Sequence, residues 1–283
     1  MKKMILTAIG CLTLLTGLCC FNALVVNPKQ LHARTETISS GKIDEDIDGL
    51  IVAYFADLHY GTYVDMEFVN KCVEMINDYD PDIIIFGGDL ADDSLNEKEK
   101  EALTNAFSKL SAPYGKYAVC GEYDYNGSNI NENIYDVLTN SGFTILNNSN
   151  AKAYIDSNSY INIVGIDSVV SANPLNAFDG VNSGTYTFAI AHYPDTFDSI
   201  MAYDFDYCLA GHSHGGQVYF PIINLINRPI GCQAYYKGKT NRNGKTLDIT
   251  NGVGRTESNA RLNADAEIVI YRLDYVNYEI TKE

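Results

Sequence analysis

Residues 50–59 read LIVAYFADLH, and residues 82–89 read DIIIFGGD. Each stretch begins as a short apolar run, which is typical of a buried strand, and each ends in residues that carry reactive groups. Between them, residues 66–79 place apolar side chains at helical spacing, which predicts an amphipathic helix. The two strands and this helix predict a β-α-β unit, the building block of a parallel sheet.

The same alternation continues along the chain. Residues 97–110 predict a second helix, whose acidic first turn suits the helix dipole, and residues 117–120 predict a third strand. Further strands are expected at residues 160–166, 185–191, 206–210, 246–250 and 266–273, and further helices at residues 131–140 and 195–202. We therefore expect an α/β fold with a largely parallel, buried sheet.

Length and composition fit one large domain. The chain has 283 residues, of which 46% are hydrophobic, so a sizeable core can form. Its formal net charge is −16. Because an acidic surface repels polyanions, we expect no nucleic-acid partner. A phosphate substrate would then depend on local positive charge, which metal ions supply.

The seven cysteines are widely spaced and include no CxxC pair, so the pattern does not indicate a structural zinc site. We interpret the cysteines of the body as small buried hydrophobic residues. A disulfide is the alternative if the domain lies outside the cell.

The first 30 residues have the character of a membrane leader. Lys2 and Lys3 precede an uncharged run from Met4 to Val26, long enough at ~1.5 Å per residue to cross a ~30 Å hydrocarbon core. We interpret residues 1–30 as an uncleaved anchor. The alternative is a cleavable signal sequence and a secreted domain. The two lysines favour a cytoplasmic N-terminus, and so a single-pass protein of the cell membrane with an extracytoplasmic catalytic domain.

The rest of the chain divides into two parts. Residues 31–48 are polar and aperiodic, which predicts a linker. Residues 49–283 then form the domain.

A polar cluster follows each of five predicted strands. The clusters are DLH at 57–59, GGD at 87–89, GEYD at 121–124, a lone His192, and GHSHGGQ at 211–217. Because sites in α/β sheets gather beyond the carboxyl ends of strands, we expect the clusters to meet. Carboxylate oxygen and neutral imidazole together favour Mn, Fe, Zn or Ni. Four of the five histidines lie in these clusters, and only His32 lies outside them.

In their order, these motifs resemble the calcineurin-like metallophosphoesterase superfamily, and most of all its bacterial membrane-associated branch with a GHxHGGQ motif. The resemblance covers roughly residues 48–275, and five ordered motifs are specific where DLH or GGD alone is weak. It implies a sandwich of two mixed β-sheets flanked by helices, with the active site at the carboxyl ends of the strands. It also implies hydrolysis of phosphate mono- or diesters by a hydroxide that two divalent metal ions activate.

The resemblance further implies a ligand set at the positions that match the family's motifs. Asp57, His59 and His214 would bind the first metal, and His192 and His212 the second. Asp89 would bridge the two metals.

One motif departs from the family, which has Asn-His-Asp where this chain has Glu122, Tyr123 and Asp124. Glu122 keeps an oxygen donor and is a candidate metal ligand, and a salt-bridging role is the alternative. Tyr123 replaces the histidine that protonates the leaving group, so we expect a weakened general acid, with simple packing as the alternative. Asp124 would hydrogen-bond Tyr123 or another group behind the ligands. We count Tyr123 and Asp124 as candidate catalytic residues.

The altered motif also raises a second hypothesis about function. A degenerate family member would bind metal and a phosphorylated ligand with little turnover.

For an active enzyme, the membrane anchor favours lipid-linked phosphates or cell-envelope phosphodiesters as substrates. Arg255 and Arg261 are candidates for binding the substrate phosphate, but arginine more commonly lies on a solvated surface, so we interpret both as surface residues and leave them out of the site.

Overall fold

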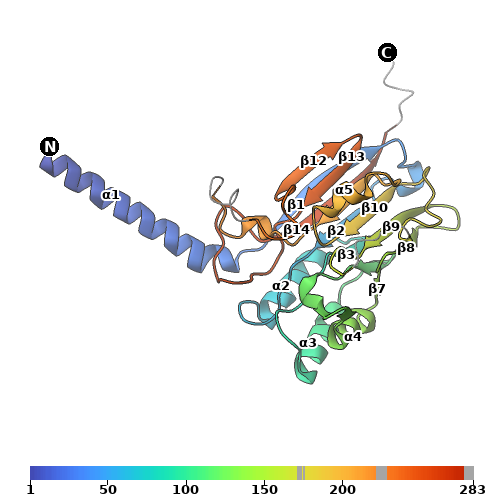
Figure 1. Ribbon diagram of the computed structural model, residues 1–283, viewed down its shortest axis with the longest axis horizontal. Helices are drawn as coiled ribbons and strands as arrows, with labels where there is room; N and C mark the ends of the chain where they lie inside the picture. The colour runs from blue at the N-terminus through green and yellow to red at the C-terminus, as the bar shows by residue number, and fades with distance from the viewer. Residues whose placement is uncertain (171–173, 175, 221–227, 277–283) are drawn as a thin grey trace, which may run out of the picture.

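The protein is described here by a computed structural model that covers residues 1–170, 174, 176–220 and 228–276. Two six-stranded mixed sheets stack face to face, with helices on their outer faces (Figure 1). The first sheet has the order β1 (His32–Ser40), β14 (Glu267–Tyr275), β2 (Ile51–Phe55), β3 (Ile83–Phe86), β4 (Lys116–Ala118), β7 (Phe143–Ile145). The second has the order β12 (Gly238–Arg242), β13 (Lys245–Ile249), β11 (Tyr207–Ala210), β10 (Thr187–Ala191), β9 (Tyr160–Ile166), β8 (Ser149–Tyr154).

Both sheets are parallel at their centres and mixed at their margins. In the first sheet β2, β3, β4 and β7 run parallel, and β14 is antiparallel to β2. In the second sheet β9, β10, β11 and β13 run parallel, and β8 and β12 are antiparallel edge strands. The expected sandwich of two mixed sheets is confirmed.

The helices cover the outer faces. The first sheet carries α2 (Met66–Asn77), α3 (Glu97–Phe107) and α4 (Glu132–Asn140), and the second carries α5 (Thr196–Ile200). The side chain of Asp65 caps α2 by accepting the N–H of Phe68 at 2.9 Å. Asn96 and Glu99 form a capping box at the start of α3. A small hairpin, β5 (Tyr125–Asn126) and β6 (Asn129–Ile130), follows β4.

Alternate residues of each central strand face different layers. Tyr54 of β2 packs between the two sheets with Ile85 and Phe188. Its neighbour Phe55 packs under the helices with Phe86. Because both faces of these strands are buried, their sequences are continuous apolar runs without polar alternation.

Residues 32–40, predicted as part of a linker, form β1, so the linker prediction is wrong there. They pair in parallel with the full length of β14. As an edge strand, β1 buries Ile38 but leaves its other face partly exposed, which explains its polar sequence. Arg34 of this strand binds Asp248 of β13 at 3.0 Å, so β1 is an integral part of the domain.

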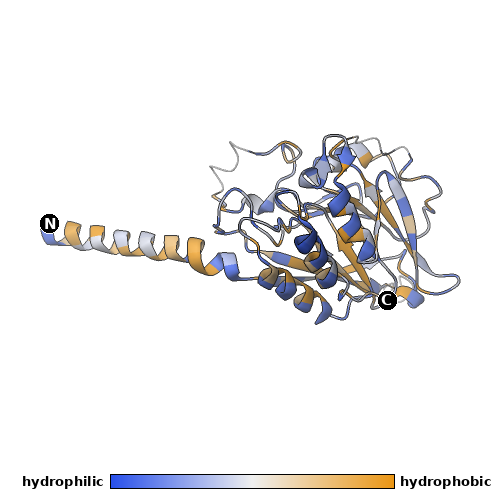
Figure 2. Cartoon of the chain, turned by 90° about the horizontal axis from the view of Figure 1, so that it is seen from below, coloured by the Kyte–Doolittle hydropathy of each residue, from blue (hydrophilic) through white to orange (hydrophobic). Residues whose placement is uncertain are grey.

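At the N-terminus, α1 (Lys2–Phe21) projects away from the body, and every one of its residues is exposed (Figure 1). A π-helical turn (Asn22–Val26) and a 3₁₀ turn (Asn27–Lys29) extend it to the body. Figure 2 shows the apolar character of this helix along its length. By length and composition, the span Lys2–Lys29 is suited to crossing a membrane, which suggests a membrane anchor.

All seven cysteines, which lie within the described part of the chain, are free thiols. The cysteines of the body are buried, as the sequence predicts.

Candidate metal centre

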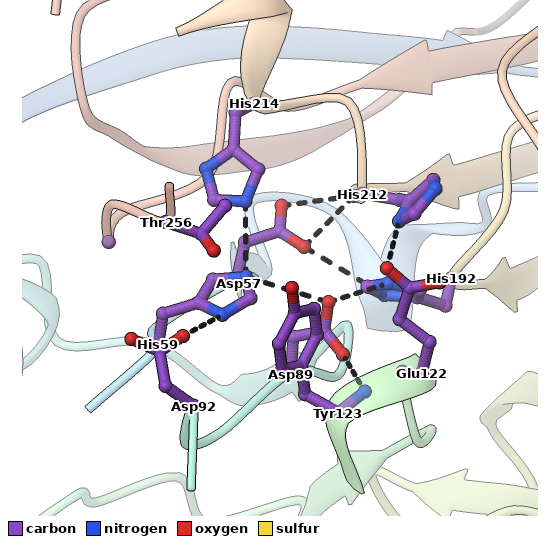
Figure 3. Close-up of polar contacts among 12 residues, drawn as sticks. Asp57, His59, Asp89, Asp92, Glu122, Tyr123, His192, His212, His214 and Thr256 are labelled. Atoms are coloured by element: carbon purple, nitrogen blue, oxygen red, sulfur yellow. Dashed lines mark hydrogen bonds and ion pairs between the residues drawn. The ribbon is translucent and has the colours of Figure 1, made fainter. Parts of the chain in front are cut away.

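The polar clusters meet at one place, as expected. Six side chains extend from the carboxyl ends of β2, β3, β10 and β11 toward a common centre (Figure 3). These side chains belong to Asp57, His59, Asp89, His192, His212 and His214. All are buried, and the most exposed of them, His212, is only 8% exposed. Buried carboxylates and imidazoles in such a group need compensating partners.

These six side chains form two groups, each of which could hold a metal ion. One group is Asp57, His59 and His214, and the other is Asp89, His192 and His212. Within each group the donor atoms lie within 4.8 Å of one another. The Oδ2 atom of Asp89 lies 3.0 Å from Nε2 of His192 and 3.5 Å from Nε2 of His59. Asp89 therefore stands between the two groups.

The backbone at these residues is strained. Asp57, His59, Asp89, His212 and His214 have φ values of 56°, 49°, 59°, 66° and 50°, in the left-handed region. For a non-glycine residue this costs about 1–3 kcal/mol, and it persists where surrounding structure imposes it. Strain concentrated at five of six converging side chains indicates a functional site.

Contacts between the strand-end loops impose this strain. The N–H of Asp57 donates to Gly88 O at 2.9 Å, and the N–H of His59 donates to Asp89 O at 3.1 Å. Gly252 packs so closely on Asp57 that a Cβ at this position would lie 2.7 Å from the Asp57 Cβ. A side chain at Gly121 would overlap the carboxylate of Asp89. Glycine is therefore required beside both aspartates.

Each of three imidazoles is oriented by one ring nitrogen and presents the other to the centre. Nδ1 of His59 lies 2.8 Å from Oδ1 of Asp92. Nδ1 of His192 donates to Gly87 O, and Nε2 of His212 donates to Ile230 O, both at 2.8 Å. This arrangement is typical of histidines that bind metals, because the outer hydrogen bond sets the tautomer.

The fourth imidazole faces another histidine. Nε2 of His214 lies 3.1 Å from Nε2 of His59. Two nitrogens bound at ~2.1 Å to adjacent positions of one metal ion would lie about 3 Å apart. The Nδ1 atom of His214 is buried and has no hydrogen-bond partner among the described residues. The donor set thus fits a cation shared by the two histidines.

Electrostatics also favour cations at this centre. Burial raises the pKa of Asp57 to about 6. Burial opposes ionisation of Asp89 as well, but the neighbouring His192 and His59 outweigh it and hold the pKa of Asp89 below its usual range. Burial, together with His59, lowers the pKa of His214 well below its usual value. Divalent cations would stabilise the ionised carboxylates and the neutral imidazoles together.

Glu122 and Tyr123 lie at the entrance to this centre. Oε2 of Glu122 accepts a hydrogen bond from Tyr193 OH at 2.9 Å, and Oε1 lies 3.9 Å from Nδ1 of His212. Glu122 is outside the two compact groups. The backbone N–H of Tyr123 donates to Oδ1 of Asp89 at 2.8 Å, and its ring stands edge-on to His59 with centroids 4.8 Å apart.

Asp124 lies behind Asp89 and is not among the residues that line the cavity. Its carboxylate is buried and accepts the N–H groups of Gly121, Asp89 and Leu90 at 2.8–2.9 Å. The structure therefore assigns it to the second of the expected alternatives, a group behind the ligands that holds the Asp89 loop. Among the described contacts, none joins its carboxylate to the Tyr123 hydroxyl, which instead bonds Thr256.

The centre opens into a cavity of about 440 Å³. Its wall includes His59, Asp89, Glu122 and Tyr123, and Gln217 of the GHSHGGQ cluster. It also includes residues that the sequence interpretation did not include: Arg228, Pro229, Tyr236, Thr256 and Glu257. Asp92 was also missed, although it lies only three residues beyond Asp89 in DLADD, a signal that could have been used. The other residues come from distant loops that carry no local motif.

Arg255 and Arg261 are buried, so the interpretation of both as solvated surface residues is wrong. The guanidinium of Arg261 donates to four carbonyls, those of Asn251, Gly252, Gly254 and Ala264. It thereby holds the loop that packs on Asp57.

Comparisons with known proteins agree with this geometry. The profile of the calcineurin-like phosphoesterase family matches residues 50–216, more than half of the chain. The metallophosphoesterase YkuE of Bacillus subtilis is 27% identical over 255 residues, which cover 89% of this chain and 88% of YkuE. Phosphodiesterase YaeI of Escherichia coli is 27% identical over 225 residues, which cover 78% of this chain and 81% of YaeI.

A third relative is a transmembrane protein with a metallophosphoesterase domain from Danio rerio. It is 24% identical over 208 residues, which cover 69% of this chain and 47% of the relative. The family match and the two buried donor groups together indicate divalent metal ions. The chain therefore belongs to the calcineurin-like phosphoesterase family and is a metal-dependent phosphoester hydrolase.

Proposed function

We propose that the protein hydrolyses phosphate mono- or diesters at a centre of two divalent metal ions, with Tyr123 as a weakened general acid. The observation that carries this proposal is the pair of buried donor groups with Asp89 between them. Asp57, His59 and His214 would hold one metal, His192 and His212 the other, and Asp89 would bridge them. Oε1 of Glu122, 3.9 Å from Nδ1 of His212, is close enough to complete the second site.

When bound, two such ions supply a hydroxide near neutral pH and stabilise charge on the phosphate oxygens; Mn, Fe, Zn and Ni all suit these donors. The residues of the chain position the metal ligands around these ions. Asp92, Gly87 O and Ile230 O each hold one ring nitrogen of three imidazoles, so that the other ring nitrogen is presented to the metals. Oxygen from water bonds to phosphorus, the ester P–O bond breaks, and the departing oxygen takes a proton.

Tyr123 is the group that we propose as the source of that proton. It lines the cavity beside Asp89 and His59. Its pKa is raised above the usual value of tyrosine: the hydrogen bond with Thr256 lowers it, but burial and the nearby carboxylates outweigh that effect. The hydroxyl is therefore protonated at neutral pH but is a weaker acid than imidazolium.

The direct test combines metal content with turnover. Full-length protein in detergent, reconstituted with Mn²⁺, is expected to bind two metal equivalents and to hydrolyse p-nitrophenyl phosphate or its bis-ester. Elemental analysis and release of nitrophenol measure the two properties separately. Protein that binds no metal after reconstitution would contradict the proposal. Two bound metals without turnover of either ester would favour the alternative, a degenerate member that binds a phosphorylated ligand.

Arg228 is expected to bind the substrate phosphate. Among the described residues that line the cavity, it carries the permanent positive charge, and its Nη1 donates to Gln233 O at 2.7 Å, which holds the guanidinium in place. Hydrogen bonds to charged groups contribute about 1.5–3 kcal/mol, so Arg228→Ala should raise KM about tenfold or more. Steady-state kinetics measure this. Arg242→Ala, which removes a surface arginine paired with Asp198, serves as the control and should leave KM unchanged.

The protein is expected to reside in the cell membrane as a single-pass protein with the catalytic domain outside the cytoplasm. Lys2 and Lys3 precede α1, and the excess of lysine at that end favours a cytoplasmic N-terminus. Protease added to intact cells should therefore digest the domain, and the anchor should remain in the membrane fraction. A mature N-terminus near Arg34 would instead support the secreted alternative.

A further inference from the structure

The base of α1 is fixed to the body without a flexible connection. Ala23, which is 8% exposed, accepts the N–H of Arg261 at 2.9 Å, and Nδ2 of Asn27 donates to Arg261 O at 3.1 Å. Nζ of Lys71 on α2 donates to Lys29 O at 2.9 Å. Only two residues separate Lys29 from the start of β1. The orientation of the helix on the body is therefore set by the fold.

The chain segment at Arg261 and Leu262, which holds the helix, is hydrogen-bonded to the wall of the cavity. The N–H of Leu262, next to Arg261, donates to Gln217 O at 2.8 Å. The side chain of Gln217 in turn bonds Thr256, and both residues line the cavity. Hydrogen-bonded backbone segments lie about 5 Å apart and adjacent Cα atoms about 3.8 Å, so the two hydrogen bonds and the peptide link between Arg261 and Leu262 place the cavity wall at most ~14 Å from Ala23.

This distance places the cavity wall within or just beyond the layer of lipid head groups if α1 spans a membrane. The 20 residues of α1, at ~1.5 Å each, match the ~30 Å hydrocarbon core and leave Ala23 at its edge. Head groups add roughly 5–8 Å on each side of that core. Figure 1 agrees, since the loop that follows β13 lies on the side of the body from which α1 emerges.

Residues of the cavity wall and residues close to them in sequence have the mixed character that suits such a position. Ile230 is 80% exposed, although its carbonyl orients His212. Phe220, on the strip that follows Gln217, is 44% exposed. Arg228 adds a positive charge at the cavity itself. Apolar and cationic side chains beside a catalytic cavity fit the boundary between acyl chains and phosphates.

We propose that the substrate is a phosphate ester carried by a membrane lipid, whose phosphate enters the cavity from the bilayer surface while its hydrocarbon chain stays in the membrane. This inference rests on the proposed hydrolase function and specifies its substrate class. The reaction is unchanged: water's oxygen bonds to phosphorus, the ester bond breaks, and the released oxygen is protonated. The fixed helix holds the cavity at the depth where lipid phosphates lie.

The test separates the helix from the body without altering either. A flexible Gly/Ser segment of about 20 residues, inserted after Asn22, would let the body move over ~25 Å while keeping every contact from Ala23 onward.

Full-length protein with Mn²⁺ is reconstituted in phosphatidylcholine vesicles that contain phosphatidic acid or phosphatidylglycerol. Glycerol 3-phosphate and glycerophosphoglycerol are the soluble counterparts with the same phosphate groups, and p-nitrophenyl esters report the function of the centre. The control carries the same insertion after Gly244, where nothing lies within 4 Å of an added Cβ.

The native protein is expected to hydrolyse a vesicle lipid at least ~10-fold faster than its soluble counterpart. The insertion after Asn22 should reduce the lipid rate ~10-fold and leave the soluble rates unchanged, while the insertion after Gly244 should change neither. Equal lipid rates for the native protein and the Asn22 insertion, or hydrolysis of soluble esters alone, would overturn the lipid proposal and leave the hydrolase function standing. Failure to cleave any ester, nitrophenyl esters included, in metal-loaded protein would overturn the proposed function itself, and the lipid proposal with it.

Discussion

Replacing Asp89 by alanine is expected to remove most of the bound metal and to lower kcat/KM at least about a thousandfold. Its Oδ2 lies between His192 and His59, at 3.0 and 3.5 Å, so one carboxylate serves both donor groups. Metal ions contribute several kcal/mol of charge stabilisation in the transition state, and each 1.36 kcal/mol is tenfold in rate. Elemental analysis and hydrolysis of bis-p-nitrophenyl phosphate measure the two losses.

A loss of folding must be distinguished from a loss of metal. Oδ1 of Asp89 accepts the N–H of Tyr123 at 2.8 Å, and alanine would leave that partly buried donor without its partner, at a cost of up to about 1–3 kcal/mol. Asp89→Asn keeps an oxygen for this N–H and removes the charge, so it should remain folded and still lose metal. Asp93→Ala, at an exposed aspartate four residues further on, is the matched control. Full metal content in folded Asp89→Asn would refute the bridging role.

The second large effect is expected at Tyr123, and it should depend on the leaving group. General acids contribute ~10²–10⁴-fold, chiefly when the departing oxygen is basic. Tyr123→Phe removes only the hydroxyl and should slow hydrolysis of alkyl esters about a hundredfold, while p-nitrophenyl esters should be affected much less. A series of esters with graded leaving-group pKa, assayed at saturating Mn²⁺, measures the slope for each variant. Tyr135→Phe removes a hydroxyl from α4, away from the cavity, and serves as the control.

Tyr123→His should act in the opposite direction. An imidazole has a pKa near 6.5, closer to neutral pH than tyrosine, so alkyl esters should be cleaved faster by this variant than by the native protein. Asp124 cannot orient that imidazole as it stands, because its oxygens are occupied by three backbone N–H groups. The gain should therefore be smaller than a fully supported histidine would provide. A flat leaving-group dependence in the native protein would show that proton donation is intact and that Tyr123 is not a weakened acid.

The central elements could be predicted because their signals are local. The strand expected at residues 160–166 is β9 with the same bounds, and the strand expected at residues 82–86 is β3 one residue shorter. A strand buried on both faces is apolar throughout, so a short window of sequence suffices to recognise it. The convergence of Asp57 and Asp89 follows from the parallel strands β2 and β3, whose carboxyl ends meet at one edge of the first sheet. His192 joins them from β10 of the second sheet, which packs on the first.

Some elements could not be recognised in this way. β1 contains Arg34 and Glu36 and resembles a linker by composition, yet its charges are paired with Asp248 and Lys239, more than 200 residues away. An edge strand buries one face only, and partners so distant in sequence leave no local pattern. β8 and β12, the antiparallel edge strands of the second sheet, were missed for the same reason.

The sequence by itself determined the fold class, the family and the candidate metal ligands, because apolar runs and the motifs that follow them are local. Only the tertiary structure decided what surrounds that centre. It placed Asp92 on His59, Asp124 behind Asp89, and Thr256 beside Tyr123. It also fixed the base of α1 against the wall of the cavity through Arg261. Such contacts join loops from separate parts of the chain, and their energy exists only once the two sheets have packed and closed those loops together.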